Sequence, residues 1–143
     1  MSIGTKLARN AAALAVAGAV LLGTAGAASA APGAPYLGYG RTTSGNGVWC
    51  VQHNINFLVN QLYAQGTITT PPPYRTLSED SSWGPRTDAN VRWFQKMVGL
   101  GQDGVVGPAT GSRLLTLGDQ DYNGSPLTGS HGWCWNYIPG DFN

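Results

Sequence analysis

Residues 80–87 read DSSWGPRT, and residues 103–110 read DGVVGPAT. The two segments share the pattern D-x-x-apolar-G-P-x-T. In each, an acidic turn residue comes first, an apolar residue follows, and a Gly-Pro pair opens an apolar stretch with helical spacing. Proline suits the first turn of a helix, because its φ is already helical and the N–H that it lacks would have no partner there. The repeat therefore predicts two turn-plus-helix units.

The apolar pattern around this repeat predicts an all-α core of three short helices. Apolar residues recur with three- and four-residue spacing over 48–62, and the helices after the two turns are expected over 85–98 and 108–117. Residues 67–82 contain three consecutive prolines and are expected to form a long loop. Each predicted helix is followed by a glycine that can end it: Gly66, Gly99 and Gly118.

The first thirty residues have the features of a secretory signal peptide. Lys6 and Arg9 provide the positive charge, and residues 11–22 form an uncharged apolar run. Residues 28–30 read ASA, a small-x-small cleavage pattern, so we expect the secreted, extracellular chain to begin at Ala31. An uncleaved membrane tether is the alternative, although the strongly apolar run is shorter than the roughly 20 residues of a spanning helix.

The charge balance argues against a polyanionic partner. The whole chain has a formal net charge of +1, and removal of Lys6 and Arg9 lowers it by two, to −1. Nucleic-acid binding relies heavily on positive charge. We therefore expect no nucleic-acid partner. No second segment approaches the length of a membrane span, so we also expect no membrane partner after signal cleavage.

The chain has two cysteines, Cys50 and Cys134. In an oxidising compartment they predict a single disulfide, which would contribute on the order of 4 kcal/mol to stability in the chain-entropy model. A metal-binding or catalytic thiol is the alternative, but neither cysteine has a CxxC neighbour. The bridge would tie an aromatic C-terminal extension, residues 119–143, to the helical domain at 44–118. Residues 31–43, rich in Gly, Pro and Tyr, are predicted to be a linker.

Three patterns together resemble a known family. The sequence follows VxxVQxxI from Val48, WGPxT from Trp83, and VxxFQxxxGLxxDGVVGxxT from Val91. These patterns resemble the small three-helix peptidoglycan-binding domain that is attached to many bacterial cell-wall hydrolases. The resemblance covers residues 47–117. It implies a cell-wall-associated protein whose partner is peptidoglycan, through either the glycan strand or the stem peptide.

The chain departs from the family pattern in two places. The family usually has a short loop with a DGxFG turn before its second helix, whereas here residues 67–82 expand the loop and Ser81 replaces the turn glycine. The aromatic extension after Gly118 has no counterpart in the minimal domain. Both departures lie where a binding surface can be remodelled.

Most of the matched residues are expected to serve the fold, and Gln52 and Gln95 are expected to bond loop carbonyl groups. Better ligand candidates are side chains that the core does not require. Aromatic rings can cover apolar sugar or methyl faces, and arginine pairs well with carboxylates of a stem peptide. The candidates are Trp83, Arg86, Arg92, Trp93, Trp133, Trp135 and Tyr137. Each ring has a structural alternative, as a core anchor for Trp83 and as tail packing for Trp133 and Trp135.

A search for catalytic residues finds no convincing constellation. Glycoside cleavage usually needs two carboxylates at a controlled separation, but Glu79 and Asp80 are sequence neighbours in a Pro-rich loop. The disulfide would draw His53 and His131 together, which together with Asp121 or Asp141 could hold a metal or form a pH-sensitive patch. Two-histidine arrangements without a clear third ligand are usually incidental, so we predict no metal, cofactor or catalytic residue.

These observations predict a secreted, non-catalytic protein that binds peptidoglycan in a groove rimmed by the expanded loop, the second helix and the extension. Two alternatives stay open. A protein-interaction module that retained the fold would use its aromatic tail against another protein. A small cell-wall hydrolase would act through the region of His53 and His131.

Overall fold

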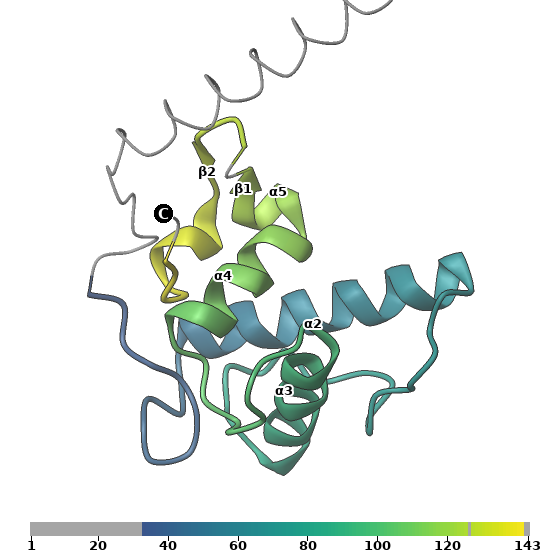
Figure 1. Ribbon diagram of the computed structural model, residues 1–143. Coiled ribbons are helices and arrows are strands. Elements are labelled where there is room, and N and C mark those ends of the chain that lie inside the picture. Colours follow the sequence, from purple (N-terminus) through teal and green to yellow (C-terminus); the bar gives the residue numbers. More distant parts are fainter. Residues whose placement is uncertain (1–32, 126, 142–143) are drawn as a thin grey trace, which may run out of the picture.

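The computed structural model describes residues 33–125 and 127–141, and the predicted signal peptide, residues 1–30, lies outside them. Its helices are α2 (Asn46–Gln65), α3 (Pro85–Met97), α4 (Pro108–Leu117) and the single-turn α5 (Gln120–Asn123). A two-stranded antiparallel ribbon of β1 (Gly124–Ser125) and β2 (Ser130–His131) follows, and then the 3-10 helix η1 (Trp133–Asn136). Figure 1 shows α3 and α4 packed on either side of the long α2, with the C-terminal elements gathered near its N-terminal half.

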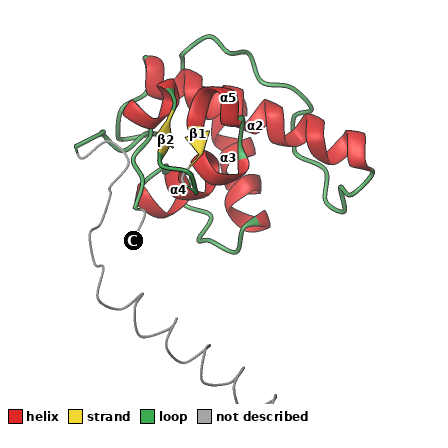
Figure 2. Ribbon diagram, turned by 90° about the horizontal axis from the view of Figure 1, so that it is seen from above, coloured by secondary structure: helices red, strands yellow, loops and turns green. Residues whose placement is uncertain are grey.

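The three-helix prediction is confirmed, and the helix ends follow its chemistry. Pro85 and Pro108 each stand in the first turn of their helix. Gly66 ends α2 in the left-handed conformation, with a φ of 64°. The ribbon and the two shortest helices were not predicted, because elements of two to four residues carry no measurable periodicity. Figure 2 shows the two short strands side by side, in yellow.

Apolar side chains from the three main helices form one core. Its fully buried members include Val51 and Ile55 on α2, Val91 on α3, and Leu114 and Leu115 on α4. Burial of one such side chain contributes about 1.5–3 kcal/mol relative to exposure. No helix in the described part of the chain is both long and apolar enough to cross a membrane.

A buried glutamine fixes the first repeated turn. Gln52 Nε2 lies within hydrogen-bond distance of three acceptors: Asp80 Oδ1 (3.0 Å), the Ser82 carbonyl (2.9 Å) and Thr87 Oγ1 (3.2 Å). Its Oε1 accepts from the Ser81 N–H at 3.1 Å. The amide thus joins α2 to the turn that opens α3, which confirms the structural role predicted for it.

Gln95 repeats this arrangement at the second turn. Its Nε2 approaches Asp103 Oδ1 (2.8 Å), the Val105 carbonyl (3.0 Å) and Thr110 Oγ1 (3.1 Å). Its Oε1 accepts from the Gly104 N–H at 3.0 Å. Each acceptor has its counterpart in the first turn, so the sequence repeat is also a repeat of hydrogen bonds.

The C-terminal extension is attached to the helices by the disulfide and by hydrogen bonds that include those of Ser112 with the Asp141 backbone. The predicted disulfide Cys50–Cys134 is present, with Cα atoms 5.6 Å apart. Beside it, Asn54 and Asn123 are fully buried and exchange hydrogen bonds of 3.0 Å and 2.7 Å through their amide groups. Buried amides are stabilising only when paired in this way, so the extension has one defined position against α2.

Residues 33–43, which we predicted to be a linker, pack against both repeated turns. Leu37 is 1% exposed and exchanges two backbone hydrogen bonds with Val106, of 3.1 Å and 2.8 Å. The Thr43 carbonyl accepts from the Trp83 N–H at 2.8 Å. The Gly- and Pro-rich composition correctly indicates irregular backbone, but it does not reveal that this backbone is used in the domain.

Candidate functional site

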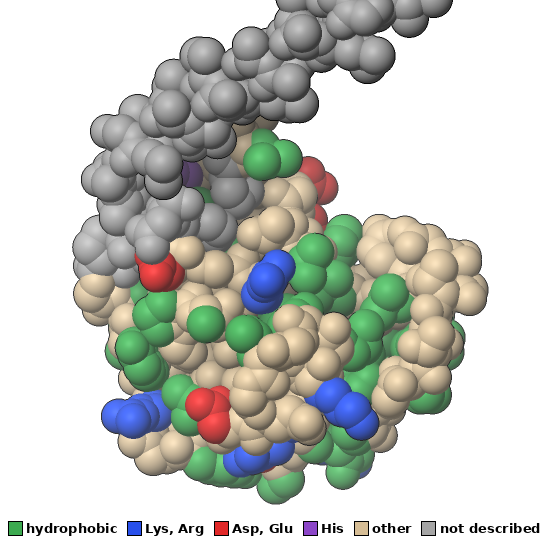
Figure 3. Space-filling view, viewed as in Figure 1, with side chains coloured by type: hydrophobic (Ala, Val, Ile, Leu, Met, Phe, Trp, Pro, Cys, Tyr) green, Lys and Arg blue, Asp and Glu red, His purple; other side chains and the backbone are tan. Residues whose placement is uncertain are grey.

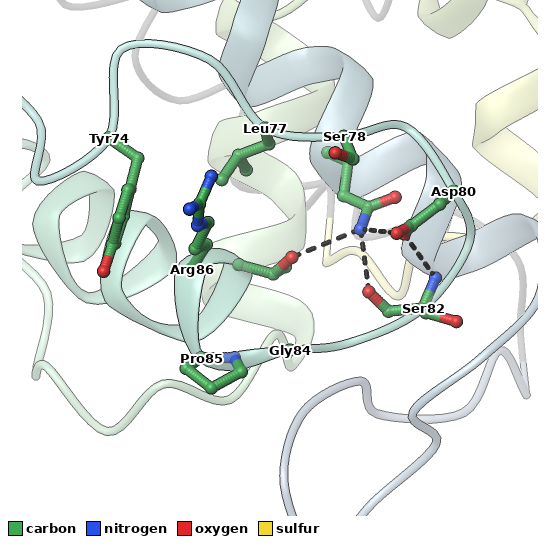
Figure 4. A pocket seen from close by; sticks show the side chains of 10 residues that line it. Tyr74, Leu77, Ser78, Asp80, Ser82, Gly84, Pro85 and Arg86 are labelled. Atoms are coloured by element: carbon green, nitrogen blue, oxygen red, sulfur yellow. Dashed lines mark hydrogen bonds between the residues drawn. The ribbon is translucent and has the colours of Figure 1, made fainter.

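A pocket of about 340 Å³ opens where the expanded loop meets the start of α3. Figure 4 shows Tyr74 and Arg86 close together on one side, and Asp80 and Ser82 on the other. The residues that line it are Gln52, Tyr74, Leu77, Ser78, Asp80, Ser82, Gly84, Pro85, Arg86 and Thr87. The loop and the second helix therefore meet at a hollow, as predicted, but the C-terminal extension does not line it.

Two buried asparagines hold the loop in this position. Asn90 on α3 accepts from the Tyr74 N–H at 3.0 Å and donates to the Tyr74 carbonyl at 2.8 Å. Asn56 on α2 makes the same pair of bonds with Leu77, at 2.8 Å and 2.9 Å. Sequence reasoning missed Tyr74 and both asparagines. The available signal was the position of each amide on an inward face of its helix, where a polar group needs a partner.

The pocket combines a cation with an open helix N-terminus. The Arg86 guanidinium lies over the Tyr74 ring at 5.1 Å from its centroid. The ion pairs among the described residues involve His53 and Arg92, so Arg86 has no carboxylate partner there. Gly84 caps α3 without a side-chain hydrogen bond. Free N–H groups and the helix dipole make such an end favourable for negative charge.

An anion stands on the opposite side of the same pocket. The Ser82 N–H and the Gln52 amide hold the pKa of Asp80 below its ordinary value, because both donate to the ionised carboxylate. Asp80 is therefore ionised at neutral pH. The pocket presents opposite charges across a small volume, which suits a ligand that has both acceptors and donors.

Three of the predicted ligand residues are part of the core. Trp83, Trp93 and Trp135 are 6%, 5% and 5% exposed. The Trp93 indole N–H donates to the Thr70 carbonyl at 2.8 Å and so anchors the expanded loop. Burial of these rings leaves too little surface for ligand contact, so we leave all three out of the proposed site.

Arg92 forms hydrogen bonds within α3 and to the residue before the second turn. Its Nε donates to Asp88 at 2.8 Å, and its Nη1 donates to the Gln102 carbonyl at 2.6 Å. These bonds occupy the guanidinium with structural partners. The remaining candidates, Trp133 and Tyr137, lie on the extension and form part of an aromatic surface that is separate from the pocket lining.

The two histidines have different surroundings. His53 Nδ1 lies 3.1 Å from Glu79, and its Nε2 lies 3.1 Å from Asp119. His131 stacks on Trp135 with ring centroids 4.3 Å apart. The carboxylates that bond His53 are thus different from Asp121 and Asp141, which we had considered as partners. No group of three or more His, Cys, Asp or Glu within 33–125 and 127–141 is arranged to hold a metal ion.

A second hollow is apolar. Its volume is about 220 Å³, and its lining residues come from α2, from α3 and its C-cap, and from α4: Leu58, Leu62, Trp93, Phe94, Met97, Val98 and Leu117. Figure 3 shows hydrophobic side chains gathered on the face between α4 and the C-terminal half of α2. This hollow has no charged lining residue and lies apart from Arg86.

Comparison with known proteins gives the class of the domain. Residues 54–114 match the family model of the putative peptidoglycan binding domain. This match confirms the resemblance seen in the sequence for residues 54–114 of the helical part. It contains Asp80, Arg86 and most of the pocket, whereas the C-terminal extension lies beyond it.

One relative is a carboxypeptidase. A 45-residue segment is 44% identical to the zinc D-Ala-D-Ala carboxypeptidase of Streptomyces albus G, and it covers 32% of this chain and 18% of that enzyme. No solved structure matches the chain. The family and this relative together place the domain in a cell-wall context.

Proposed function

We propose that this protein is a secreted, non-catalytic peptidoglycan-binding protein that binds the stem peptide in the pocket at the start of α3. The observation that carries the proposal is the Arg86 guanidinium, which lies without a carboxylate partner among the described residues, beside the open N-terminus of α3. Most of this pocket lies in the segment that matches the peptidoglycan-binding family. The predicted signal peptide supports export.

The pocket offers complementary contacts to a short peptide. A carboxylate of the ligand would accept from Arg86 and from free N–H groups of α3, while Asp80 would accept from an amide or ammonium group. The sides formed by Tyr74 and Leu77 suit the methyl groups of alanine residues. A hydrogen bond to a charged group contributes about 1.5–3 kcal/mol, so two such contacts in an open pocket support modest affinity.

The carboxylates near the pocket favour binding over catalysis. Asp80 accepts from Gln52 and from the Ser82 backbone, and its pKa is lowered rather than raised as a general acid requires. Glu79 is bonded to Asn56 and His53. These groups act as fixed acceptors. The carboxypeptidase relative is consistent with a shared wall-binding segment, because only 18% of that enzyme is covered.

Co-sedimentation with purified peptidoglycan sacculi tests the proposal. The protein is purified under oxidising conditions, mixed with sacculi and centrifuged, and the supernatant is analysed for released fragments. We expect protein in the pellet and no muropeptides in the supernatant. Muropeptide release would establish the hydrolase alternative. Protein that stays in solution would overturn wall binding and favour the protein-interaction alternative.

A further inference from the structure

Five rings form a continuous aromatic surface on the side of the extension. We use the name aromatic surface for Trp49, His53, Tyr122, Trp133 and Tyr137. Trp49 stacks on His53 at 4.7 Å between centroids, and both rings contact Tyr122, at 5.4 Å and 4.5 Å. The Trp133 ring meets the Trp49 ring edge-on, with centroids 5.3 Å apart. It also contacts the Tyr137 ring in a tilted arrangement, with centroids 4.9 Å apart. These contacts fix the rings relative to one another.

The aromatic surface depends on the features that distinguish this chain from the minimal domain. All five rings lie outside the family match at residues 54–114. Three of them belong to the extension, and the disulfide joins Cys50 to Cys134, the immediate neighbours of Trp49 and Trp133 in the chain. The bridge therefore holds the two tryptophans together.

Two of the five rings are largely exposed, whereas Trp49 and Tyr137 are partly buried against the core. Trp133 is 42% exposed and Tyr122 is 40% exposed, whereas Trp135 in the same 3-10 helix is 5% exposed. A large ring that is half in water loses part of the hydrophobic stabilisation that burial provides. Two such rings, held beside Trp49 by tilted and edge-on ring contacts, form an apolar surface of the kind that binds ligands.

Carboxylate acceptors border the aromatic surface. His53 lies between the carboxylates of Glu79 and Asp119. The other oxygen of Glu79 accepts from Asn56 Nδ2 (3.0 Å), and the other oxygen of Asp119 accepts from the Asp121 N–H (3.0 Å). Each ionised carboxylate oxygen can accept more than one hydrogen bond. No Arg or Lys in the described part of the chain pairs with Glu79 or Asp119. This edge thus suits a neutral ligand with many donors and disfavours an anion.

We infer that the aromatic surface is a second ligand site, which binds a pyranose ring of the glycan strand. A sugar ring has an apolar C–H face that can lie on Trp133 and hydroxyl or acetamido donors that can reach Asp119 and Glu79. This inference rests on the proposed function and assigns the two parts of peptidoglycan to two sites. Glu79 borders the aromatic surface and Asp80 lines the Arg86 pocket, so consecutive residues connect the glycan site with the stem-peptide site.

A soluble oligosaccharide tests the glycan site separately from the wall. The probe is a β-1,4-linked hexamer of N-acetylglucosamine, and binding is followed by calorimetry and by tryptophan fluorescence with the full protein. The wild type is expected to bind, and Trp133→Ala is expected to bind at least tenfold more weakly. Trp133→Phe keeps an aromatic ring and is expected to retain a large part of the affinity. Tyr39→Ala removes a ring that is 51% exposed elsewhere on the surface and is the matched control.

Thermal unfolding and near-ultraviolet circular dichroism verify that each variant is folded, and Tyr122→Ala replaces Trp133→Ala if the latter is not. Equal binding of the hexamer by wild type and the alanine variant, or no binding by the wild type, would overturn the glycan site. Sacculus binding without hexamer binding would overturn the glycan site and leave the proposed function intact. Hexamer binding without sacculus binding would instead reject the proposed function and retain a saccharide site.

Discussion

The turn at residues 80–87 and the turn at residues 103–110 are fixed by corresponding glutamines, and the first of them lines the pocket that contains Arg86. A Cβ atom added to Gly84 in the first turn would meet open space, whereas one added to Gly107 in the second would lie 3.2 Å from the Tyr36 ring. Residues 33–43 thus cover the start of α4 and leave the start of α3 free.

The two turns also differ at the residue in the left-handed conformation. Gly104 has a φ of 71°, and a Cβ there would lie 2.5 Å from Asp88 Oδ1 and 2.8 Å from Arg92 Nη2. Ser81 has a φ of 63° at the corresponding position, and it is the only non-glycine with positive φ among residues 33–125 and 127–141. One hydrogen-bond arrangement therefore serves two purposes. The turn at residues 103–110, which we call the covered turn, is structural. The turn at residues 80–87, which we call the open turn, is available for binding.

The largest expected effect comes from removal of the glutamine of the covered turn. Gln95→Ala leaves the Gly104 N–H and several acceptors without their partner inside the protein. We expect the free energy of unfolding to fall by on the order of 3 kcal/mol in urea titrations. Gln52→Ala should cost less, because its turn is more exposed to water, and should also weaken sacculus binding. A loss below about 1 kcal/mol for Gln95→Ala would show that the amide does not hold the turn.

A serine in the covered turn is expected to be the next most costly change. Gly104→Ser requires a left-handed serine and displaces the Asp88–Arg92 pair, so we expect a loss of about 2–3 kcal/mol. Chemical denaturation measures this loss. If the variant were as stable as the wild type, the close packing inferred around Gly104 would be wrong.

The reverse change in the open turn should have a small effect of opposite sign. Ser81→Gly relieves a left-handed residue but adds chain entropy to the unfolded state, so we expect a gain of at most about 0.5 kcal/mol. Its midpoint of thermal unfolding, compared with that of the wild type, checks the sign. A clear destabilisation would mean that the Ser81 side chain has a role that its backbone conformation does not explain.

The smallest expected effect is a change in acid stability. Hydrogen bonds from the Val105 N–H and the Gln95 amide, together with the positive charge of Arg92, lower the pKa of Asp103 below 3.8 in the folded state. The resulting stabilisation is present above that ordinary value and is lost as the pH falls through the folded pKa. Asp103→Asn should therefore lose less stability than the wild type between pH 5 and pH 2, as measured by thermal unfolding. Asp141→Asn, an exposed position, is the control and should follow the wild type.

The sequence was sufficient for the helices, the disulfide and the role of the two glutamines. Helical spacing, proline in the first turn and a terminal glycine are local signals, and two cysteines allow a single pairing. The position of the expanded loop was not predictable, because it depends on bonds from Asn56 and Asn90 to residues 16 to 21 positions away. Local propensity does not specify such pairs.

The candidate site was predictable only in part. Arg86 was identified from its place on the second helix and its chemistry. The tryptophans were ambiguous, because a ring in a core and a ring on a ligand surface look alike in sequence. Burial separates Trp83, Trp93 and Trp135 from the half-exposed Trp133. The packing of residues 33–43 over the second turn, which leaves only the first turn open, required the structure.

The central claim is that the open turn forms the peptide-binding site, and quantitative sacculus binding of Arg86→Ala tests it most directly. Arg113→Ala removes the same charge from an exposed position on α4 outside the pocket and is the matched control. Gly84→Leu fills the pocket from a position where a Cβ meets open space. We predict that Arg86→Ala and Gly84→Leu bind sacculi at least fivefold more weakly than the wild type, while Arg113→Ala binds normally. Wild-type binding by folded Arg86→Ala would contradict the account.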